Sequence, residues 1–260
     1  ACATRIGCYS SLADTIRGNR MRLADHILKL EAALNRQLAA MSFSAPVSHV
    51  YNPLLYADAP HQDYVRRYAR PRPRALLLGM NPGPFGMAQT GVPFGEVSSV
   101  KTWLAIDQPV GQPERVHPKR PIQGFQCTRS EVSGQRLWTW ARQRWGQPER
   151  FFDDCYVHNF CPLIFMADSG RNITPDKLVK DEREAVYGAC EASLADLVSL
   201  LQPECVVAVG VFAEARARSS CADIPVHKMP HPSPASPAAN RGWSDLANAV
   251  FDELGIGERP

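Results

Sequence analysis

Four short apolar runs constrain the fold of this chain more than any other feature of its sequence. They cover residues 75–80, 155–160, 205–210 and 224–229, and the stretches between them are much longer than hairpin loops. Helical patterns fill these stretches. Strands that alternate with helices form right-handed crossovers and a parallel sheet that is covered on both faces. We therefore predict an α/β fold with a central four-stranded parallel sheet and helices on both faces.

The helices are predicted from apolar spacing and from capping residues. Apolar side chains recur every three or four residues from Leu23 to Leu38, which is typical of an amphipathic helix. Further helices are predicted over 98–106 and 133–145, and from two starts with a cap followed by proline, Thr174-Pro175 and Ser236-Pro237. Residues 1–19 lack strong periodicity. We predict a flexible tail over 1–19 and a single α/β domain over 20–260.

Composition excludes some classes of protein and leaves others open. The chain has no apolar run of about 18 residues and no signal-like amino end, so neither a membrane span nor secretion is expected. The net charge is only +3, but 23 of the 29 basic residues are Arg, whose planar fork suits phosphate. The eight cysteines contain no CxxC pair, so buried structural thiols are favoured over a zinc or iron–sulfur site. We expect no metal and no cofactor.

Three polar residues follow predicted strands directly. Asn81 lies in a glycine-rich loop after the first strand, Asn159 ends the second, and His231 lies in a proline-rich loop after the fourth. Each residue taken singly also fits a plain turn, a cap or a surface position. In parallel sheets, however, ligands bind beyond the carboxyl ends of the strands, so the three side chains are expected to converge in one cleft. Such a cleft could hold a polar heterocycle, position a water and stabilise an anionic leaving group.

The two loops also resemble known motifs. Residues 79–95, GMNPGPFGMAQTGVPFG, and residues 231–234, HPSP, resemble the two signature motifs of the uracil-DNA glycosylase superfamily. The specific residues look like those of its single-strand-selective monofunctional members. The resemblance extends over about 75–254, and its first motif is the more specific one. It implies an enzyme that flips a damaged base out of DNA and hydrolyses its N-glycosidic bond, leaving an abasic site.

The resemblance assigns roles to individual residues. Asn81 corresponds to the residue that positions the water, and His231 to the one that hydrogen-bonds uracil O2 as a neutral imidazole. The base pocket would comprise Met80, Gly83, Met87, Phe94 and Asn159, where Phe94 stacks on the base and Asn159 reads its N3–H and O4 edge. Gly83 replaces a tyrosine that excludes the thymine methyl in other members, which implies room for 5-hydroxymethyluracil. The implied DNA contacts are Ser169, Gly170, Arg171, Asn172, Thr174, Pro232, Ser233, Pro234, Ala235, Ser236, Pro237 and Arg241.

The resemblance also carries expectations about lyase activity, partners and location. Neither motif contains a lysine, so no Schiff-base lyase activity is expected, although Lys228 lies near the second motif. DNA, single- or double-stranded, is the expected partner, no membrane is expected, and the protein would be a nuclear monomer that hands its product to an abasic-site endonuclease. Three alternatives rank well below this interpretation: a mismatch-specific thymine or uracil glycosylase of the same superfamily, a non-catalytic DNA-binding module on this fold, and a cysteine-ligated iron–sulfur glycosylase.

Overall fold

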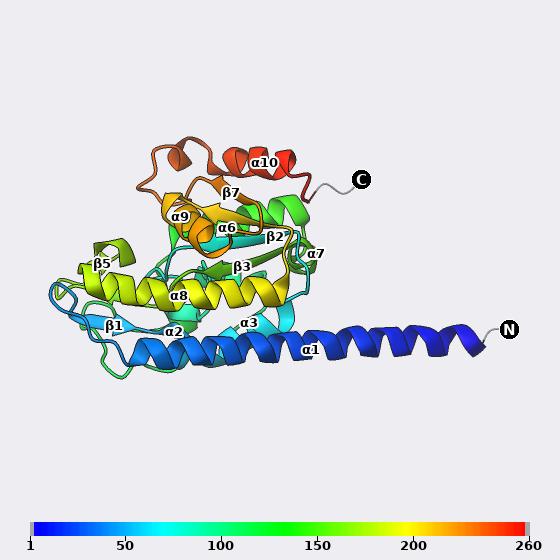
Figure 1. Ribbon diagram of the computed structural model, residues 1–260, viewed down its shortest axis with the longest axis horizontal. Coiled ribbons are helices and arrows are strands. Elements are labelled where there is room, and N and C mark those ends of the chain that lie inside the picture. Colours follow the sequence, from blue (N-terminus) through cyan, green and yellow to red (C-terminus); the bar gives the residue numbers. More distant parts are fainter. Residues whose placement is uncertain (1–2, 258–260) are drawn as a thin grey trace.

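The four apolar runs form one parallel sheet in the computed structural model (Figure 1), as the sequence predicts. Its strands are β2 (Ala75–Gly79), β3 (Cys155–Asn159), β6 (Cys205–Val209) and β7 (Val226–Met229), in the order β3-β2-β6-β7. Gly79 lies in register with Asn159, so two of the segments that were expected to carry chemistry end side by side. The structure describes the backbone of residues 3–257 and the side chains of residue 18 and residues 20–257.

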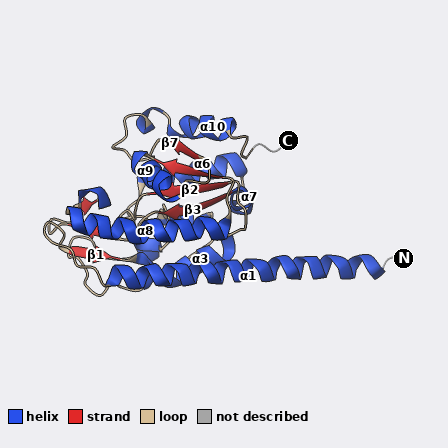
Figure 2. Ribbon diagram, in the orientation of Figure 1, coloured by secondary structure: helices blue, strands red, loops and turns tan. Residues whose placement is uncertain are grey.

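Helices cover both faces of this sheet, with α8 and α9 on the near side in Figure 2 and α6 on the far side. The chain between β2 and β3 forms α4 (Met87–Thr90), α5 (Val97–Thr102), α6 (Val132–Trp145) and α7 (Pro148–Asp154). The rest of the cover comes from α8 (Lys180–Leu201), α9 (Val211–Ser220) and α10 (Trp243–Glu253). Large aromatic side chains fill the far layer: Trp140 packs edge-on against Trp145 and Phe251. This packing explains why residues 133–145 read as a helix with one apolar face.

A second, antiparallel sheet joins a strand that precedes the main sheet to two strands that come after β3, and the sequence did not predict it. It joins β1 (His49–Tyr51), β4 (Ile164–Met166) and β5 (Asn172–Ile173) in the order β1-β4-β5. Strands of two or three residues are too short to show a periodicity of their own, and β1 pairs with a segment more than 100 residues away. The small sheet places Asn172 beside the carboxyl end of the main sheet.

The helix predicted from Leu23 is the last part of a longer helix, α1 (Ala3–Ala39). Figure 1 shows α1 and α8 running side by side along one edge of the molecule. Ile27, Leu34 and Leu38 are buried on its inner face, next to α2 (Pro53–Tyr56) and α3 (Asp58–Tyr68). The helix is continuous through residue 19, where the sequence suggested a tail. The division into a tail and a single domain stays a prediction.

Both helices predicted to start at a cap followed by proline begin later than expected. Pro175 opens a single 3-10 turn, Pro175–Lys177, and α8 begins only at Lys180. After Ser236-Pro237 the chain likewise forms a 3-10 turn, Ala239–Arg241, before α10 begins at Trp243. Proline fixes the first turn of a helix equally well for either helix type, so the signal locates a turn and does not determine its length.

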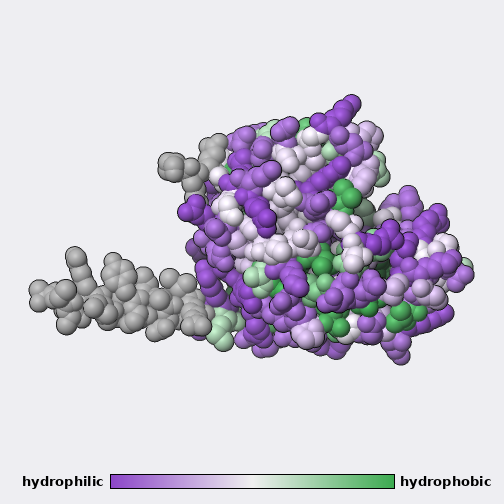
Figure 3. Space-filling model, turned by 180° about the vertical axis from the view of Figure 1, so that it is seen from behind, coloured by the Kyte–Doolittle hydropathy of each residue, from purple (hydrophilic) through white to green (hydrophobic). Residues whose placement is uncertain are grey.

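The cysteines and the charged runs behave as structural groups. Six of the eight cysteines are buried free thiols, as predicted, and Cys2 and Cys8 lie outside the described side chains. Three of the five arginines of residues 66–74 pair with acids from other parts of the chain, among them Arg66 with Asp25 and Arg74 with Glu204. No helix in the described residues combines the length and the apolarity needed to cross a membrane. Most of the face in Figure 3 is hydrophilic, and its hydrophobic residues form small groups.

Candidate active site

A pocket of about 480 Å³ opens at the carboxyl ends of the parallel strands. The three polar residues that follow β2, β3 and β7 all line it, which confirms that Asn81, Asn159 and His231 converge. The other residues around it are Met80, Pro82, Gly83, Pro84, Phe94, Glu131, Ser133, Asn172, Thr174, Ser233, Ala235 and Ser236. Two cavities of similar size, about 570 and 460 Å³, lie along α1, away from these strand ends.

Asn81 presents a free carbonyl oxygen to the pocket. Its Nδ2 donates a hydrogen bond to the Leu163 carbonyl at 3.0 Å, which fixes the orientation of the amide. Among the described residues, Oδ1 takes no hydrogen bond. An amide oxygen held in this way can accept one proton of a water molecule and direct a lone pair of that water into the pocket. The backbone segment that supplies the Leu163 carbonyl follows β3, so two strand ends fix this side chain.

His231 carries its proton on Nε2. The Ser233 backbone N–H donates to His231 Nδ1 at 3.1 Å, and because a backbone amide can only donate, Nδ1 must be unprotonated. Burial lowers the pKa of His231 from 6.5 to about 4, so the imidazole is neutral at physiological pH. Nε2–H is then the donor that remains for a ligand. Gly210 leaves room for this ring, since a Cβ there would lie 3.1 Å from the His231 Cβ.

Asn159 and Phe94 meet over Gly79. A Cβ on Gly79 would lie 2.3 Å from Asn159 Oδ1 and 2.6 Å from the Phe94 ring, so this position requires glycine. Asn159 Nδ2 lies 3.2 Å from the sulfur of Met87, which sits behind the amide rather than on the pocket surface. The Phe94 ring is 8% exposed, and its centroid lies 6.1 Å from that of His231. The pocket is therefore a slot with one aromatic wall and amide and imidazole groups at its edge.

Glu131, which the sequence analysis missed, forms the wall beyond Gly83. It caps α6 by accepting the Gly134 N–H at 3.1 Å, and its side chain lies 3.4 Å from where a Gly83 Cβ would be. Burial raises the pKa of the Glu131 carboxyl, although hydrogen bonds from Ser133 and Gly134 act in the opposite direction. A side chain at position 83 would point toward Glu131. In the sequence, the acidic residue directly before the helix predicted over 133–145 was the available sign of this cap.

The predicted DNA contacts divide into those at the pocket rim and those outside it. Asn172 and Thr174 lie on one side of the pocket, and Ser233, Ala235 and Ser236 on the other. Ser169 and Arg171 are exposed beyond the first side, while Gly170 is buried against the side chains of His117 and Arg120. Pro232, Pro234, Pro237 and Arg241 belong to the second loop without lining the pocket. The helix N-terminus expected after Thr174 is not in this rim, because α8 starts at Lys180.

Side chains from α6 and α10 hold the second loop from outside. Arg136 donates to the Pro232 carbonyl at 2.9 Å and to Asn240 Oδ1 at 3.0 Å. Trp243 Nε1 donates to the Pro230 carbonyl at 2.7 Å. No local pattern in the sequence marks Arg136, because its partners lie about 100 residues further along the chain. These contacts determine where the segment carrying His231 lies.

Lys228, near the second motif, makes an ion pair with Glu214 at 3.0 Å and does not line the pocket. Within the described part of the chain, no group of three or more His, Cys, Asp or Glu side chains is arranged to hold a metal ion. The polar side chains that line the pocket include the amides of Asn81, Asn159 and Asn172, the imidazole of His231 and the carboxyl group of Glu131.

Comparison with known proteins identifies the family. The profile of the uracil DNA glycosylase superfamily matches residues 66–254, which include every residue of the pocket. The chain is also 51% identical over 238 residues to the single-strand selective monofunctional uracil DNA glycosylase of Bos taurus, covering 90% of this chain and 88% of that protein. The chain belongs to the uracil DNA glycosylase superfamily. The chain is therefore a uracil-DNA glycosylase, a DNA repair hydrolase that acts on N-glycosyl bonds. Its substrate is DNA.

Other members of the superfamily are also similar to this chain. The Mus musculus single-strand selective monofunctional uracil DNA glycosylase is 49% identical over 238 residues, covering 90% of this chain and 85% of that protein. The crystal structure of wild-type SMUG2 from Pedobacter heparinus shares the fold with a TM-score of 0.64 at 19% identity, covering 90% of this chain and 98% of that one. These comparisons confirm the family and the fold that the two loop motifs suggested.

Proposed function

We propose that this glycosylase excises uracil, and C5-modified uracils such as 5-hydroxymethyluracil, from single- and double-stranded DNA without cutting the strand. The observation that carries the proposal is the convergence of three strand ends on one pocket, where Asn81 Oδ1 and the His231 Nε2–H have no hydrogen-bond partner among the described residues. A flipped base needs a slot closed by an aromatic ring and polar groups, and the pocket has that form.

Asn81 and His231 act on the two ends of the bond that breaks. As the bond from C1′ to N1 lengthens, its electron pair leaves with the base, and the Nε2–H of neutral His231 stabilises the negative charge that reaches O2. The sugar becomes an oxocarbenium-like cation. Asn81 Oδ1 holds a water whose oxygen adds to C1′, and the proton of that water is then lost to solvent. An amide activates water weakly, which suffices when bond breaking runs ahead of water attack.

The remaining pocket residues select the base. Phe94 stacks on it, and Asn159 accepts from N3–H and donates to O4, a pattern that cytosine does not offer. Gly83 leaves space at C5, bounded by Glu131, and this space accommodates a substituent on that carbon. Met80 contributes backbone to the same slot, and Met87 supports Asn159 from behind.

The DNA is held on both sides of the pocket. Ser169, Gly170, Arg171, Asn172 and Thr174 would contact the backbone on one side, where Arg171 is exposed. On the other side the segment from Pro232 to Arg241 would enter the duplex and fill the space that the base vacates. This segment contains the prolines Pro232, Pro234 and Pro237 and the serines Ser233 and Ser236, and Ala235 lies at the pocket rim. Prolines reduce the conformational entropy that such a loop loses on binding.

The absence of strand cleavage is part of the proposal. A lyase would need an amine free to attack C1′, and Lys228 is paired with Glu214 outside the pocket. We further propose that the enzyme acts as a monomer in the nucleus and passes its abasic product to an abasic-site endonuclease.

Base release from a single-stranded oligonucleotide with one uracil, in the presence of EDTA, tests the proposal. Free uracil together with an alkali-labile but intact strand is the expected result. Release only from a mismatched duplex would instead favour a mismatch-specific glycosylase. Binding without release would leave a non-catalytic module, and strand scission without alkali would contradict the monofunctional assignment. The same assay with 5-hydroxymethyluracil tests the space at Gly83.

A further inference from the structure

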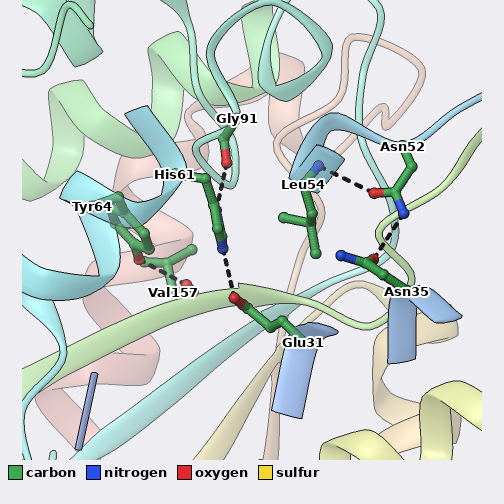
Figure 4. Close-up of polar contacts among 8 residues, drawn as sticks. All are labelled: Glu31, Asn35, Asn52, Leu54, His61, Tyr64, Gly91 and Val157. Atoms are coloured by element: carbon green, nitrogen blue, oxygen red, sulfur yellow. Dashed lines mark hydrogen bonds and ion pairs between the residues drawn. The ribbon is translucent and has the colours of Figure 1, made fainter. Parts of the chain in front are cut away.

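A buried contact between α1 and α3 lies behind the base pocket and has no role in the proposed chemistry. Glu31 Oε2 on α1 and His61 Nε2 on α3 are 2.8 Å apart, and His61 Nδ1 lies 2.8 Å from the Gly91 carbonyl (Figure 4). Both side chains are almost completely buried, with 6% and 4% exposed. A buried pair of this kind is expensive to form, so its position beside the loop that carries Phe94 calls for an explanation.

The hydrogen bonds determine where the protons are. A carbonyl can only accept, so His61 Nδ1 donates to Gly91. Burial lowers the pKa of His61, but the charge of Glu31 and the hydrogen bonds to Glu31 and Gly91 outweigh it, and the net pKa is raised. The raised pKa of His61 and the 2.8 Å contact with Glu31 both favour an ion pair between the two side chains. The second carboxylate oxygen, Glu31 Oε1, is buried and has no hydrogen-bond partner among the described residues.

A small cavity joins this pair to the base-reading amide. Its volume is about 10 Å³, and Glu31, His61, Met87, His158 and Asn159 are among the residues that line it. A volume of this size, with polar groups around it, suits one water molecule. Asn159 faces it from the other end: its Nδ2 points toward Met87, which lines the cavity, while its Oδ1 lies over Gly79 beside Phe94.

We propose that Glu31 and His61 are positioning residues for the Asn159 amide and act through one water held in this cavity. This inference rests on the proposed function, because it concerns how the same pocket reads its base. A carboxylate can only accept, so the water donates to Glu31 Oε1 and presents a lone pair toward Asn159. One Nδ2 hydrogen is thereby directed into the cavity, where the water and the Met87 sulfur share it, and the other stays available for O4 of the base. Oδ1 is left to accept N3–H. The reverse orientation, which would suit cytosine, loses this hydrogen bond.

His61 gives the carboxylate a fixed place. Its bond to the Gly91 carbonyl joins α3 to the segment that ends in Phe94, and a Cβ on Gly91 would lie 2.5 Å from the Ala57 carbonyl and 3.3 Å from the His61 Cβ. The loop is thus pressed against α3 where His61 holds it. This contact fixes His61, and His61 in turn holds the Glu31 carboxylate beside the cavity.

A double-mutant cycle in the full chain tests the proposal. Glu31→Ala removes the acceptor for the water, and we expect the single-turnover rate of uracil release to fall about 10-fold. In an Asn159→Ala background the same substitution should change the rate less than about 2-fold, because no amide is left to position. The matched control is Asn35→Ala, which removes another buried polar contact of α1, the bond from Asn52 Nδ2 at 2.8 Å (Figure 4). It should change the rate less than about 2-fold in both backgrounds.

A conservative variant keeps the test informative if Glu31→Ala folds poorly. At pH 8 in Glu31→Gln, His61 lacks its carboxylate and is neutral, so the Gln amide donates to His61 Nε2 and its oxygen still accepts from the water. We expect this variant to release uracil within about 2-fold of the wild-type rate. Cytosine release, measured in parallel, should rise above background only in Glu31→Ala.

The outcomes separate this inference from the proposed function. Equal losses in Glu31→Ala and Asn35→Ala, or a Glu31→Ala loss that persists in the Asn159→Ala background, would overturn the positioning role and leave uracil release by the wild type intact. A wild-type enzyme that releases no uracil would instead overturn the proposed function. A Glu31→Gln variant as slow as Glu31→Ala at equal stability would also contradict the water-mediated link.

Discussion

The two loops that carry Asn81 and His231 are rigid for different reasons. The loop after β2, residues 79–95, is largely buried, and at four of its five glycines, Gly79 and Gly91 among them, a Cβ would strike a neighbour. The loop after β7, residues 230–241, is largely half-exposed or exposed, and Arg136 and Trp243 hold it by hydrogen bonds from other helices. Packing therefore shapes one half of the pocket, whereas the other half is held by a few hydrogen bonds from other helices, or tethers.

This difference predicts how each loop responds to mutation. Packing cannot be altered without moving the slot itself, so damage to the first loop should slow the chemical step. A lost tether leaves the side chain of His231 intact but its segment free to move, so damage to the second loop should weaken DNA binding more than catalysis. The four predictions below test this distinction, from the largest expected effect on the rate to the smallest.

The largest effect should be the same in both loops, because both supply a group to the reaction. His231→Leu removes the donor to O2 and should lower single-turnover uracil release by about 10² to 10³-fold. Asn81→Ala should cause a loss of similar order by releasing the water. Binding of uracil-containing DNA, measured by fluorescence anisotropy, should change little in either variant. Full activity in either one would remove that residue from the mechanism.

Gly79→Ala tests the packed loop directly. The new methyl would meet Asn159 Oδ1 and the Phe94 ring at once, and we expect the single-turnover rate to fall about 10²-fold as the slot is displaced. Gly83→Ala is the matched control in the same loop, since its Cβ would make ordinary contacts with Glu131 at 3.4 Å. It should keep most of its activity on uracil. Equal losses in the two variants would show that the loop is sensitive to any added side chain, not to this contact.

Arg136→Ala tests the tethered loop. It removes the bonds to the Pro232 carbonyl and to Asn240, and we expect KM to rise about 5-fold while kcat stays within about 2-fold. Trp243→Phe, which loses only the bond to the Pro230 carbonyl, should show the same pattern more weakly. Steady-state kinetics on single-stranded uracil DNA would measure both values. A fall in kcat without a rise in KM would mean that the position of this loop, too, determines the rate of the chemical step.

The sequence predicted the parts of this molecule that depend on local pattern. The four buried strands were clear because both faces of the sheet are covered, which leaves unbroken apolar runs such as 75–80. Asn81, Asn159 and His231 were placed correctly because a parallel sheet brings its strand ends together. Their roles in the reaction stay predictions.

The parts that the sequence missed depend on partners far along the chain. Glu31 meets His61 on another helix, and Arg136 meets Asn240 about 100 residues later, so neither carries a local signal. The short strands β1 and β5 form only because β4 lies between them. The predictions that helices start at Thr174 and Ser236 were wrong, because a cap followed by proline fits a single 3-10 turn as well as a helix. Tertiary partners therefore decided the missed contacts and the short strands, whereas local turn geometry decided the two helix starts.

The smallest expected effect is an absence of change with pH. His231 has a pKa of about 4 because burial disfavours its charged form, so as the pH falls from 8 to 5 the neutral donor persists and its contribution to the rate stays constant. Below that range the ring gains a proton on Nδ1, where Ser233 N–H now donates, and the tether closest to the reaction is lost. NMR titration of the imidazole, assigned by comparison with His231→Asn, measures this directly. A midpoint near 6.5 would mean that the pocket admits water around His231 and that the second loop is looser than its tethers suggest.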